Sequence, residues 1–163
     1  MTAGKVILRT AALADTAVIL KFIRALAEYE NLSHMVIATE QSLTDHLFGP
    51  NPVAETLIAS LDGQDVGFAL FFRSFSTFLG KPGIYLEDLF VLPEVRGKGV
   101  GQALLAEVAR IAMDRDCGRL EWAVLDWNDP AIGFYNKLGA VRLDDWTTYR
   151  VTGDALRRLG GRL

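Results

Sequence analysis

The fold is decided by Tyr85-Leu86-Glu87-Asp88-Leu89-Phe90-Val91-Leu92-Pro93-Glu94-Val95-Arg96-Gly97-Lys98-Gly99-Val100-Gly101. The first half of this stretch is apolar, β-branched and aromatic, which predicts a strand, and Pro93 ends it because proline cannot donate to a sheet ladder. The second half is rich in glycine. Apolar residues then recur with the spacing of one buried helical face, at Val100, Leu104, Val108 and Ile111. The stretch therefore predicts a strand, a glycine-rich turn and the start of a helix.

The glycine-rich turn suits a ligand that carries phosphate. Glycine lets backbone N–H groups approach a ligand closely, and a helix N-terminus carries partial positive charge. A tight turn that needs positive φ is the plainer interpretation of a single Gly-x-Gly. The spacing of Gly97, Gly99 and Gly101 fits neither the dinucleotide-binding fingerprint nor the nucleoside-triphosphate loop. Both of these nucleotide classes are therefore disfavoured.

Length and composition predict one domain over residues 1–163, because half of the 163 residues are hydrophobic. A net charge of -3 argues against a nucleic-acid partner, which normally meets a basic face. No apolar run approaches the roughly 20 residues that span a bilayer, and Lys5 and Arg9 interrupt the N-terminus before a secretory segment could form. We therefore expect a cytoplasmic protein that does not bind membranes.

Cysteine and histidine are too scarce for a metal cluster. Cys117 has no second cysteine to pair with, and a packed, inert thiol is favoured over a nucleophile at this position. His34 and His46 have no metal-ligand spacing, so we expect no metal.

The rest of the chain reads as alternating strands and helices. Strands are predicted at 6–9, 55–61, 66–72, 120–125, 141–143 and 147–151, with a hairpin turn at 62–65 and a further turn at 80–83. Helices are predicted at about 13–30, at 40–47 after the N-cap Thr39, at 130–138 after the cap Asp129, and at 154–159. This order indicates a mixed α/β sheet with helices on both faces.

Two motifs resemble those of the GNAT acetyltransferase superfamily. Residues 91–101 are similar to its acyl-coenzyme A loop, Arg/Gln-x-x-Gly-x-Gly/Ala after a strand that ends near proline. Residues 128–140 are similar to its second signature, Asn-x-x-Ala-x-x-Phe-Tyr-x-x-x-Gly-Phe/Ala. The stretches 27–30, 85–88 and 123–128 further resemble the diamine (spermidine/spermine) acetyltransferases and their relatives that acetylate thialysine.

The resemblance implies an α/β (α+β) fold with a central mixed, mostly antiparallel sheet flanked by helices on both faces. It also implies acetyl-CoA as co-substrate, a small cationic amine as acceptor, and a homodimer whose C-terminal strands are exchanged or packed between subunits. The residues that it assigns to the coenzyme are Leu89, Phe90, Val91, Arg96, Gly97, Lys98, Gly99, Val100, Gly101, Gln102 and Asn128.

The resemblance places a second group of residues around the amine: Tyr29, Glu30, Glu87, Asp88, Glu121, Trp122 and Ala123. A further family glutamate corresponds to Thr147, with Asp144 and Asp145 close by in sequence. This departure leaves the choice between polyamine and thialysine open.

The chemistry explains why carboxylates and a phenol are needed. An alkylammonium has a pKa of about 10.4, so only about one amine in a thousand is deprotonated at neutral pH. We assign Glu87 to amine binding and proton acceptance, and Asp88 to the substrate pocket or to the strand's other face, because adjacent strand residues point oppositely. The resemblance makes Tyr135 the general acid.

Each of these residues also has a simpler explanation. Glu87 or Asp88 could form a salt bridge, and for Asp88 this is as well supported as a direct role. Tyr135 could be a core aromatic residue, Arg96 a surface arginine, and Tyr29 with Glu30 an exposed helix end.

The sequence thus predicts an N-acetyltransferase that moves the acetyl group of acetyl-CoA to a primary amine of a polyamine, a diamine or a thialysine-like or lysine-like acceptor. A protein or amino-acid N-acetyltransferase and a non-catalytic acyl-CoA-sensing module remain as alternatives.

Overall fold

The computed structural model describes residues 4–162. The chain forms two compact units, Met1–Ala123 and Val124–Leu163. The domain predicted over 1–163 includes residues 1–3 and 163, which lie outside the described residues, and its single-domain character stays a prediction.

The first unit holds most of the secondary structure. Its strands are β1 (Val6–Thr10), β2 (Glu55–Leu61), β3 (Gln64–Ser76), β4 (Lys81–Val91) and β5 (Leu120–Glu121). Its helices are η1 (Leu13–Asp15), α1 (Thr16–Tyr29), η2 (Ser33–Met35), α2 (Glu40–Leu47), η3 (Pro93–Val95) and α3 (Val100–Asp114). The second unit contains α4 (Asp129–Lys137) and α5 (Gly153–Leu159).

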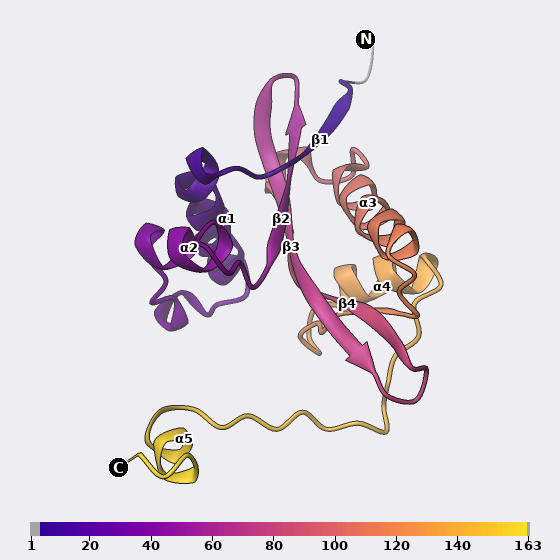
Figure 1. Ribbon diagram of the computed structural model, residues 1–163. Helices are drawn as coiled ribbons and strands as arrows, with labels where there is room; N and C mark the ends of the chain where they lie inside the picture. Colours follow the sequence, from indigo (N-terminus) through magenta and orange to yellow (C-terminus); the bar gives the residue numbers. More distant parts are fainter. Residues whose placement is uncertain (1–3, 163) are drawn as a thin grey trace. The chain divides into compact units, whose positions relative to one another are not determined.

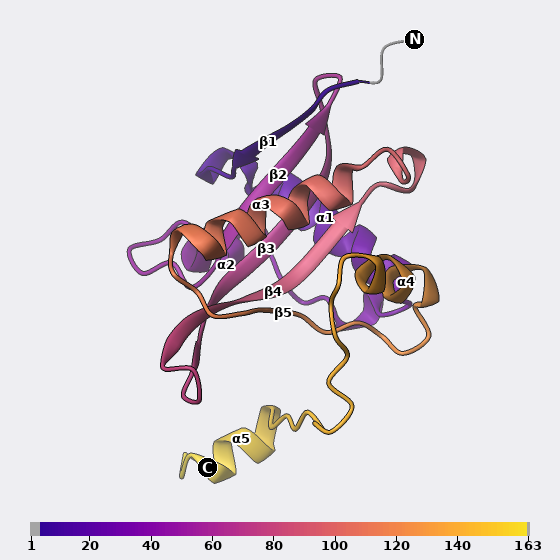
Figure 2. The same cartoon turned by 90° about the vertical axis from the view of Figure 1, so that its right-hand side faces the viewer.

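The five strands form one sheet in the order β1-β2-β3-β4-β5. Neighbours from β1 to β4 are antiparallel, whereas β4 and β5 are parallel. Helices α1 and α2 lie on one face of this sheet and α3 lies on the other (Figures 1 and 2). The predicted class, a mixed and mostly antiparallel sheet with helices on both faces, is confirmed.

The core lies between α1 and the sheet. Phe22 of α1 stacks on Phe68 of β3 with ring centroids 5.6 Å apart and lies 6.3 Å from the ring of Phe90 on β4. Burying a side chain of this size stabilises the fold by about 1.5–3 kcal/mol. Because Phe90 lies one residue before the end of β4, this core also anchors the strand that leads into the glycine-rich turn.

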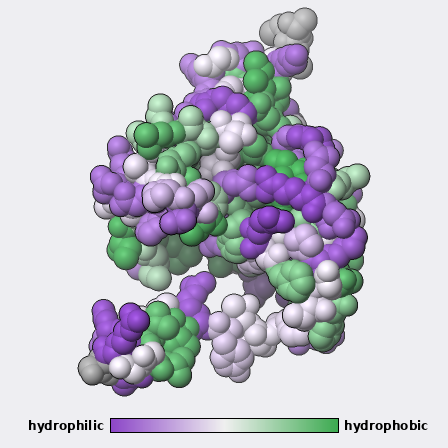
Figure 3. Space-filling model, in the orientation of Figure 1, coloured by the Kyte–Doolittle hydropathy of each residue, from purple (hydrophilic) through white to green (hydrophobic). Residues whose placement is uncertain are grey.

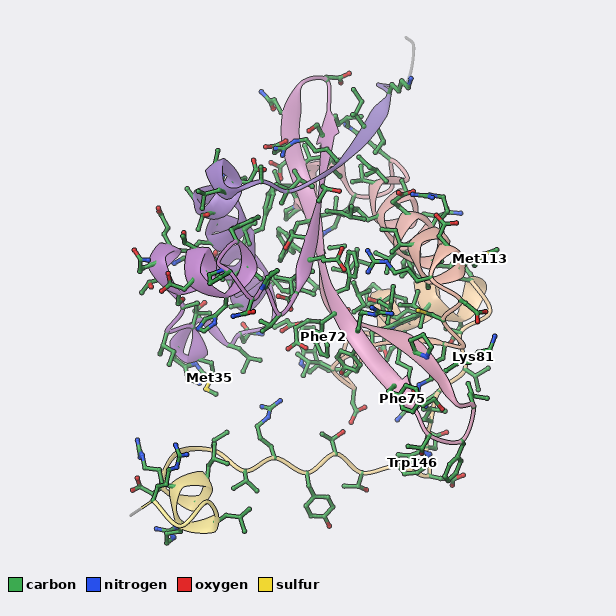
Figure 4. The ribbon with its side chains drawn as sticks, viewed as in Figure 1. Met35, Phe72, Phe75, Lys81, Met113 and Trp146 are labelled. Carbon is green, nitrogen blue, oxygen red and sulfur yellow. The ribbon has the colours of Figure 1, made fainter. Side chains whose placement is uncertain are left out.

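Helix α3 follows the predicted apolar periodicity. Val100, Leu104 and Val108 are buried against the sheet. Met113 points outward from the far side of the helix (Figure 4). The visible surface around α1 and α2 carries both hydrophilic and hydrophobic residues (Figure 3).

Two local predictions need correction. The turn predicted at 80–83 is wrong, because Lys81, Pro82 and Gly83 already pair with β3. Pro82 is tolerated there because it lies at the start of the strand. The cap of α4 is Asn128, whose side-chain oxygen accepts from the Ala131 N–H at 3.4 Å, and Asp129 is already helical.

The strand predicted at 120–125 is reduced to the two residues of β5. Ile84 pairs with Leu120 and Tyr85 with Glu121, and the ladder then ends. A register shift between β3 and β4 follows at once and leaves Glu87 as the extra residue of a β-bulge. A bulge bends its strand and disrupts the local ladder, which explains why β4 and β5 stop pairing here.

The strands predicted at 141–143 and 147–151 do not form within the described part of the second unit. Strand pairing requires a neighbouring edge, and the described residues of this unit contain no strand to provide one. The apolar side chains are therefore left in solvent, with Val141 83% exposed and Tyr149 92% exposed. The helix predicted at 154–159 is confirmed as α5.

Candidate active site

The β-bulge places two adjacent carboxyl groups at the middle of β4. Asp88 pairs with Leu70 and is half-buried, whereas Glu87 has no cross-strand partner in the β3 register and is exposed. A bulge sets two residues against one and disrupts the local ladder. The charge of Glu87 acts on the Asp88 carboxyl, and the placement of the two side chains on opposite faces stays a prediction.

Asp88 is the most strongly perturbed acid of this site. Burial raises the pKa of its carboxyl, and the charges of Glu87 and Glu30 raise it further, to about 7. Glu30 caps the C-terminal end of α1, where burial raises the pKa of its own carboxyl. The structure thus brings together three acids that the sequence named on two separate elements. We call Glu30, Glu87 and Asp88 the acid cluster.

Tyr29, the last residue of α1, contacts Arg96 at the start of the glycine-rich turn. The Arg96 guanidinium lies 4.6 Å from the centroid of the Tyr29 ring and 5.7 Å from that of Phe90. Its Nε donates to the carbonyl oxygen of Val91 at 3.0 Å. The side chain therefore folds back toward β4 and α1.

The glycine-rich turn has the form of an anion-binding site. Gly97 and Gly99 adopt φ values of 78° and 82°, and a Cβ added to either would meet open space. Gly99 caps α3 without a side-chain hydrogen bond. The first N–H groups of any helix lack an acceptor within the helix, so those of Val100, Gly101 and Gln102 can bind a ligand. Such a cradle suits a phosphate-bearing ligand.

The end of β4 offers main-chain groups on one edge. Leu89, Phe90 and Val91 pair with β3 on the other edge, and the ladder to β5 has ended at Tyr85. On the edge of β4 that faces β5, the main-chain groups of Leu89, Phe90 and Val91 therefore lie beyond the end of the β5 ladder. An extended ligand arm needs such a strand edge to pair with.

Glu121 lies in β5, and Trp122 and Ala123 follow directly after this strand. The Glu121 carboxylate forms an ion pair with Arg119 Nε at 2.9 Å. Trp122 is half-buried and Ala123 is exposed. Glu121 is therefore partly neutralised, unlike the acid cluster on β4 and α1.

Asn128 and Tyr135 belong to the second unit. Asn128 is buried and caps α4, so its side chain has a structural role. Tyr135 is half-buried on α4, with its ring 5.4 Å from that of Phe134. The roles of both residues toward a ligand stay predictions.

The sequence did not single out the aromatic pair beside the bulge. Phe72 of β3 and Tyr85 of β4 are register partners whose ring centroids lie 5.3 Å apart. Phe72 and the exposed Phe75 lie along β3 (Figure 4). The cross-strand register is needed to pair these residues, and the sequence does not reveal it.

Comparison with known proteins identifies the family. The family model described as "Acetyltransferase (GNAT) family" matches residues 22–140. The chain belongs to the GNAT acetyltransferase family. Thialysine N-epsilon-acetyltransferases of Sus scrofa and Mus musculus are 42% and 39% identical to it, over 98% and 95% of this chain and 99% and 97% of theirs. An L-ornithine N5-acetyltransferase of Arabidopsis thaliana is 33% identical, over 93% of this chain and 86% of its own.

A solved structure agrees with the fold. An integron cassette protein of V. cholerae superposes with a TM-score of 0.79 at 27% identity, covering 95% of this chain and 97% of that chain. The GNAT membership confirms the prediction made from the two motifs. The chain is an acyl-CoA-dependent N-acetyltransferase of this family.

Residues 4–162 contain no group of three or more His, Cys, Asp and Glu residues that could hold a metal ion. No helix in the same range is long and apolar enough to cross a membrane.

Proposed function

We propose that this GNAT enzyme acetylates a primary amine of a small acceptor with at least one further cationic group, of the thialysine, lysine or diamine class, with acetyl-CoA as donor. The acid cluster is the observation that carries the proposal. Burial and the charges of Glu87 and Glu30 raise the pKa of Asp88, and this acidic site attracts a cation and leaves an uncharged amine without a partner. The identity to thialysine N-epsilon-acetyltransferases supports the same class.

Acetyl-CoA, when bound, supplies the thioester whose acetyl group is transferred. The N–H groups of residues 97–102 bind its diphosphate, and main-chain groups of Leu89, Phe90 and Val91 orient its pantetheine arm. Asn128 completes the coenzyme site.

The acid cluster prepares the amine. Glu30 and Asp88 hold the acceptor through its positive charge, with Tyr29, Trp122 and Ala123 as further walls of the site. Glu87, which is exposed at the bulge, takes the ammonium proton through water, so that the nitrogen lone pair becomes available. Tyr135 donates the proton of its phenolic oxygen to the departing sulfur.

A thiol-release assay tests the acceptor class. The panel contains thialysine, lysine, ornithine, putrescine, spermidine and a lysine-containing peptide. We expect turnover of the small cationic amines and little with the peptide. Preference for the peptide would favour a protein acetyltransferase, and no thiol release with any amine would favour a coenzyme-sensing module.

The acid cluster is tested with a matched control at the same end of α1. Glu30→Gln should raise the KM of the small amine about tenfold, because it removes one of the charges that attract the cation. Glu28→Gln removes a charge from an exposed position two residues earlier in the chain and should leave the KM unchanged. Equal effects of the two variants would mean that only the overall charge matters.

We also propose a cytoplasmic homodimer in which segment 141–151 pairs with a second copy of the chain. The exposed apolar residues of this segment, including Val141 and Trp146, support the proposal because the described part of their own unit offers no strand to pair with. Light scattering coupled to size exclusion should give twice the chain mass, and a chain truncated after residue 140 should be monomeric. A monomeric full-length chain would contradict the proposal.

A further inference from the structure

The side chain of Arg96 joins two parts of the first unit that bind different ligands in the proposed function. Its backbone begins the glycine-rich turn, where its N–H donates to the Pro93 carbonyl oxygen at 3.2 Å. Its guanidinium lies 4.6 Å from the Tyr29 ring centroid at the end of α1. Its Nε donates to the Val91 carbonyl oxygen at the end of β4. One side chain thus contacts the ends of both elements that carry the acid cluster.

The contact with Tyr29 is a cation–π contact and not an ion pair. Within residues 4–162, Arg96 forms no salt bridge, although the acid cluster occupies the same two elements. The charges that act on Asp88 are those of Glu87 and Glu30. Arg96 therefore braces the site without neutralising the carboxyl groups that a cationic amine would need.

The geometry of arginine suits this arrangement. A guanidinium is planar, so one face can stack on the Tyr29 ring while Nε keeps its hydrogen bond to Val91. A lysine has a single point charge and no group equivalent to Nε. It would lose the hydrogen bond and the planar stack while it keeps the charge.

From these contacts we infer that Arg96 is a positioning residue that couples the two substrate sites. It fastens the start of the glycine-rich turn to the end of α1, so that a well-placed Tyr29 helps to hold the turn ready for acetyl-CoA. Coupling of this kind is reciprocal, so a bound acetyl-CoA also orders the end of α1 that carries Glu30. The inference rests on the proposed function for the amine site.

A direct phosphate contact by Arg96 gives different expectations. If the side chain served only to bind the diphosphate, Tyr29 would not influence acetyl-CoA binding, and lysine at position 96 would restore much of the affinity. Coupling through the stack predicts an effect of Tyr29 on acetyl-CoA and poor rescue by lysine.

A double-mutant cycle separates the two cases. Acetyl-CoA is titrated calorimetrically, without amine, into the wild-type chain, Arg96→Gln, Tyr29→Leu and the double variant. We expect each single variant to weaken binding about three- to tenfold, in the range of a cation–π contact. We expect the double variant to bind no more weakly than Arg96→Gln alone. Arg96→Lys should bind as weakly as Arg96→Gln.

Two matched variants complete the design. Tyr29→Phe keeps the ring and should bind acetyl-CoA within about twofold of the wild type, which also shows whether the fold tolerates changes at this position. Lys98→Gln removes a charge from the same turn without touching Tyr29, so its effect should add to that of Tyr29→Leu. The inference is overturned if Tyr29→Leu leaves acetyl-CoA affinity unchanged, if the effects of the Arg96 and Tyr29 changes add, or if Arg96→Lys restores binding. Because the titration contains no amine, a wrong acceptor class would not affect its outcome.

Discussion

Asp88 on β4 lies within electrostatic reach of Glu30 at the end of α1, and the Glu30 charge contributes to raising the pKa of the Asp88 carboxyl to about 7. The two residues are far apart in the sequence and meet because α1 packs on the face of the sheet near β4. The position of this pKa has consequences for activity and for stability.

Activity should depend on pH through the ionisation of Asp88. Below about pH 7 this carboxyl is mostly protonated and attracts a cationic amine less. We expect kcat/KM for the amine to rise as pH increases through about 7. Asp88→Asn should lose this rise and have a lower kcat/KM at about pH 8. If kcat/KM of Asp88→Asn still rises near about pH 7, another group is responsible for the rise.

Stability should change in the opposite direction with pH. The carboxyl of Asp88 has a raised pKa in the folded chain, so the folded state binds more protons than the unfolded state between about pH 4 and 7, and stability falls as pH rises through this window. Asp88→Asn avoids the buried charge and should be about 1–3 kcal/mol more stable than the wild type at about pH 8. Urea unfolding should show this gain vanishing near about pH 4. A gain of equal size at both pH values would point to a cause other than ionisation.

The positive φ of Gly99 should make it intolerant of a side chain. Gly99→Ala forces alanine into the left-handed region and should destabilise the chain by about 1–2 kcal/mol. Gly101→Ala is the matched control for stability, because Gly101 is helical and a Cβ there would meet only Val91 Cγ2, at 3.7 Å. Thermal unfolding should give a lower melting temperature for Gly99→Ala than for Gly101→Ala. Equal melting temperatures would show that the turn relaxes around the introduced methyl group.

Loss of the Tyr135 hydroxyl should slow turnover without weakening coenzyme binding. Tyr135→Phe keeps the ring that packs beside Phe134, so α4 should remain folded. We expect kcat to fall by about 10²–10⁴-fold, the usual contribution of a general acid, with the acetyl-CoA Kd within about twofold. Tyr149→Phe, at a highly exposed position, should change neither quantity. Parallel losses of kcat and of affinity would argue against the acid role.

Local patterns predicted much of the fold because the decisive chemistry lies within a few residues. Thr39 accepts from the Ser42 N–H at 3.1 Å as the predicted N-cap of α2, and Asp62-Gly63 joins β2 to β3 as the predicted hairpin turn. The apolar periodicity of α3 reappears as its buried face. In each case, the residues that determine the element also make its contacts.

The strand predictions that were wrong share a different cause. Whether residues 122–125 or 141–151 form strands depends on an edge supplied by another segment, and the bulge at Glu87 depends on the register of β3. Strand propensity does not contain this information, because hydrogen-bond partners in a sheet lie far apart in the chain.

The sequence by itself determined the family and the types of residue available for its chemistry, since both motifs are short and continuous. Only the tertiary structure decided that Glu30, Glu87 and Asp88 share one electrostatic environment and that Arg96 turns toward Tyr29. Charge coupling and ring stacking act over a few ångströms in space, and packing of α1 against β4 brings these side chains within that range.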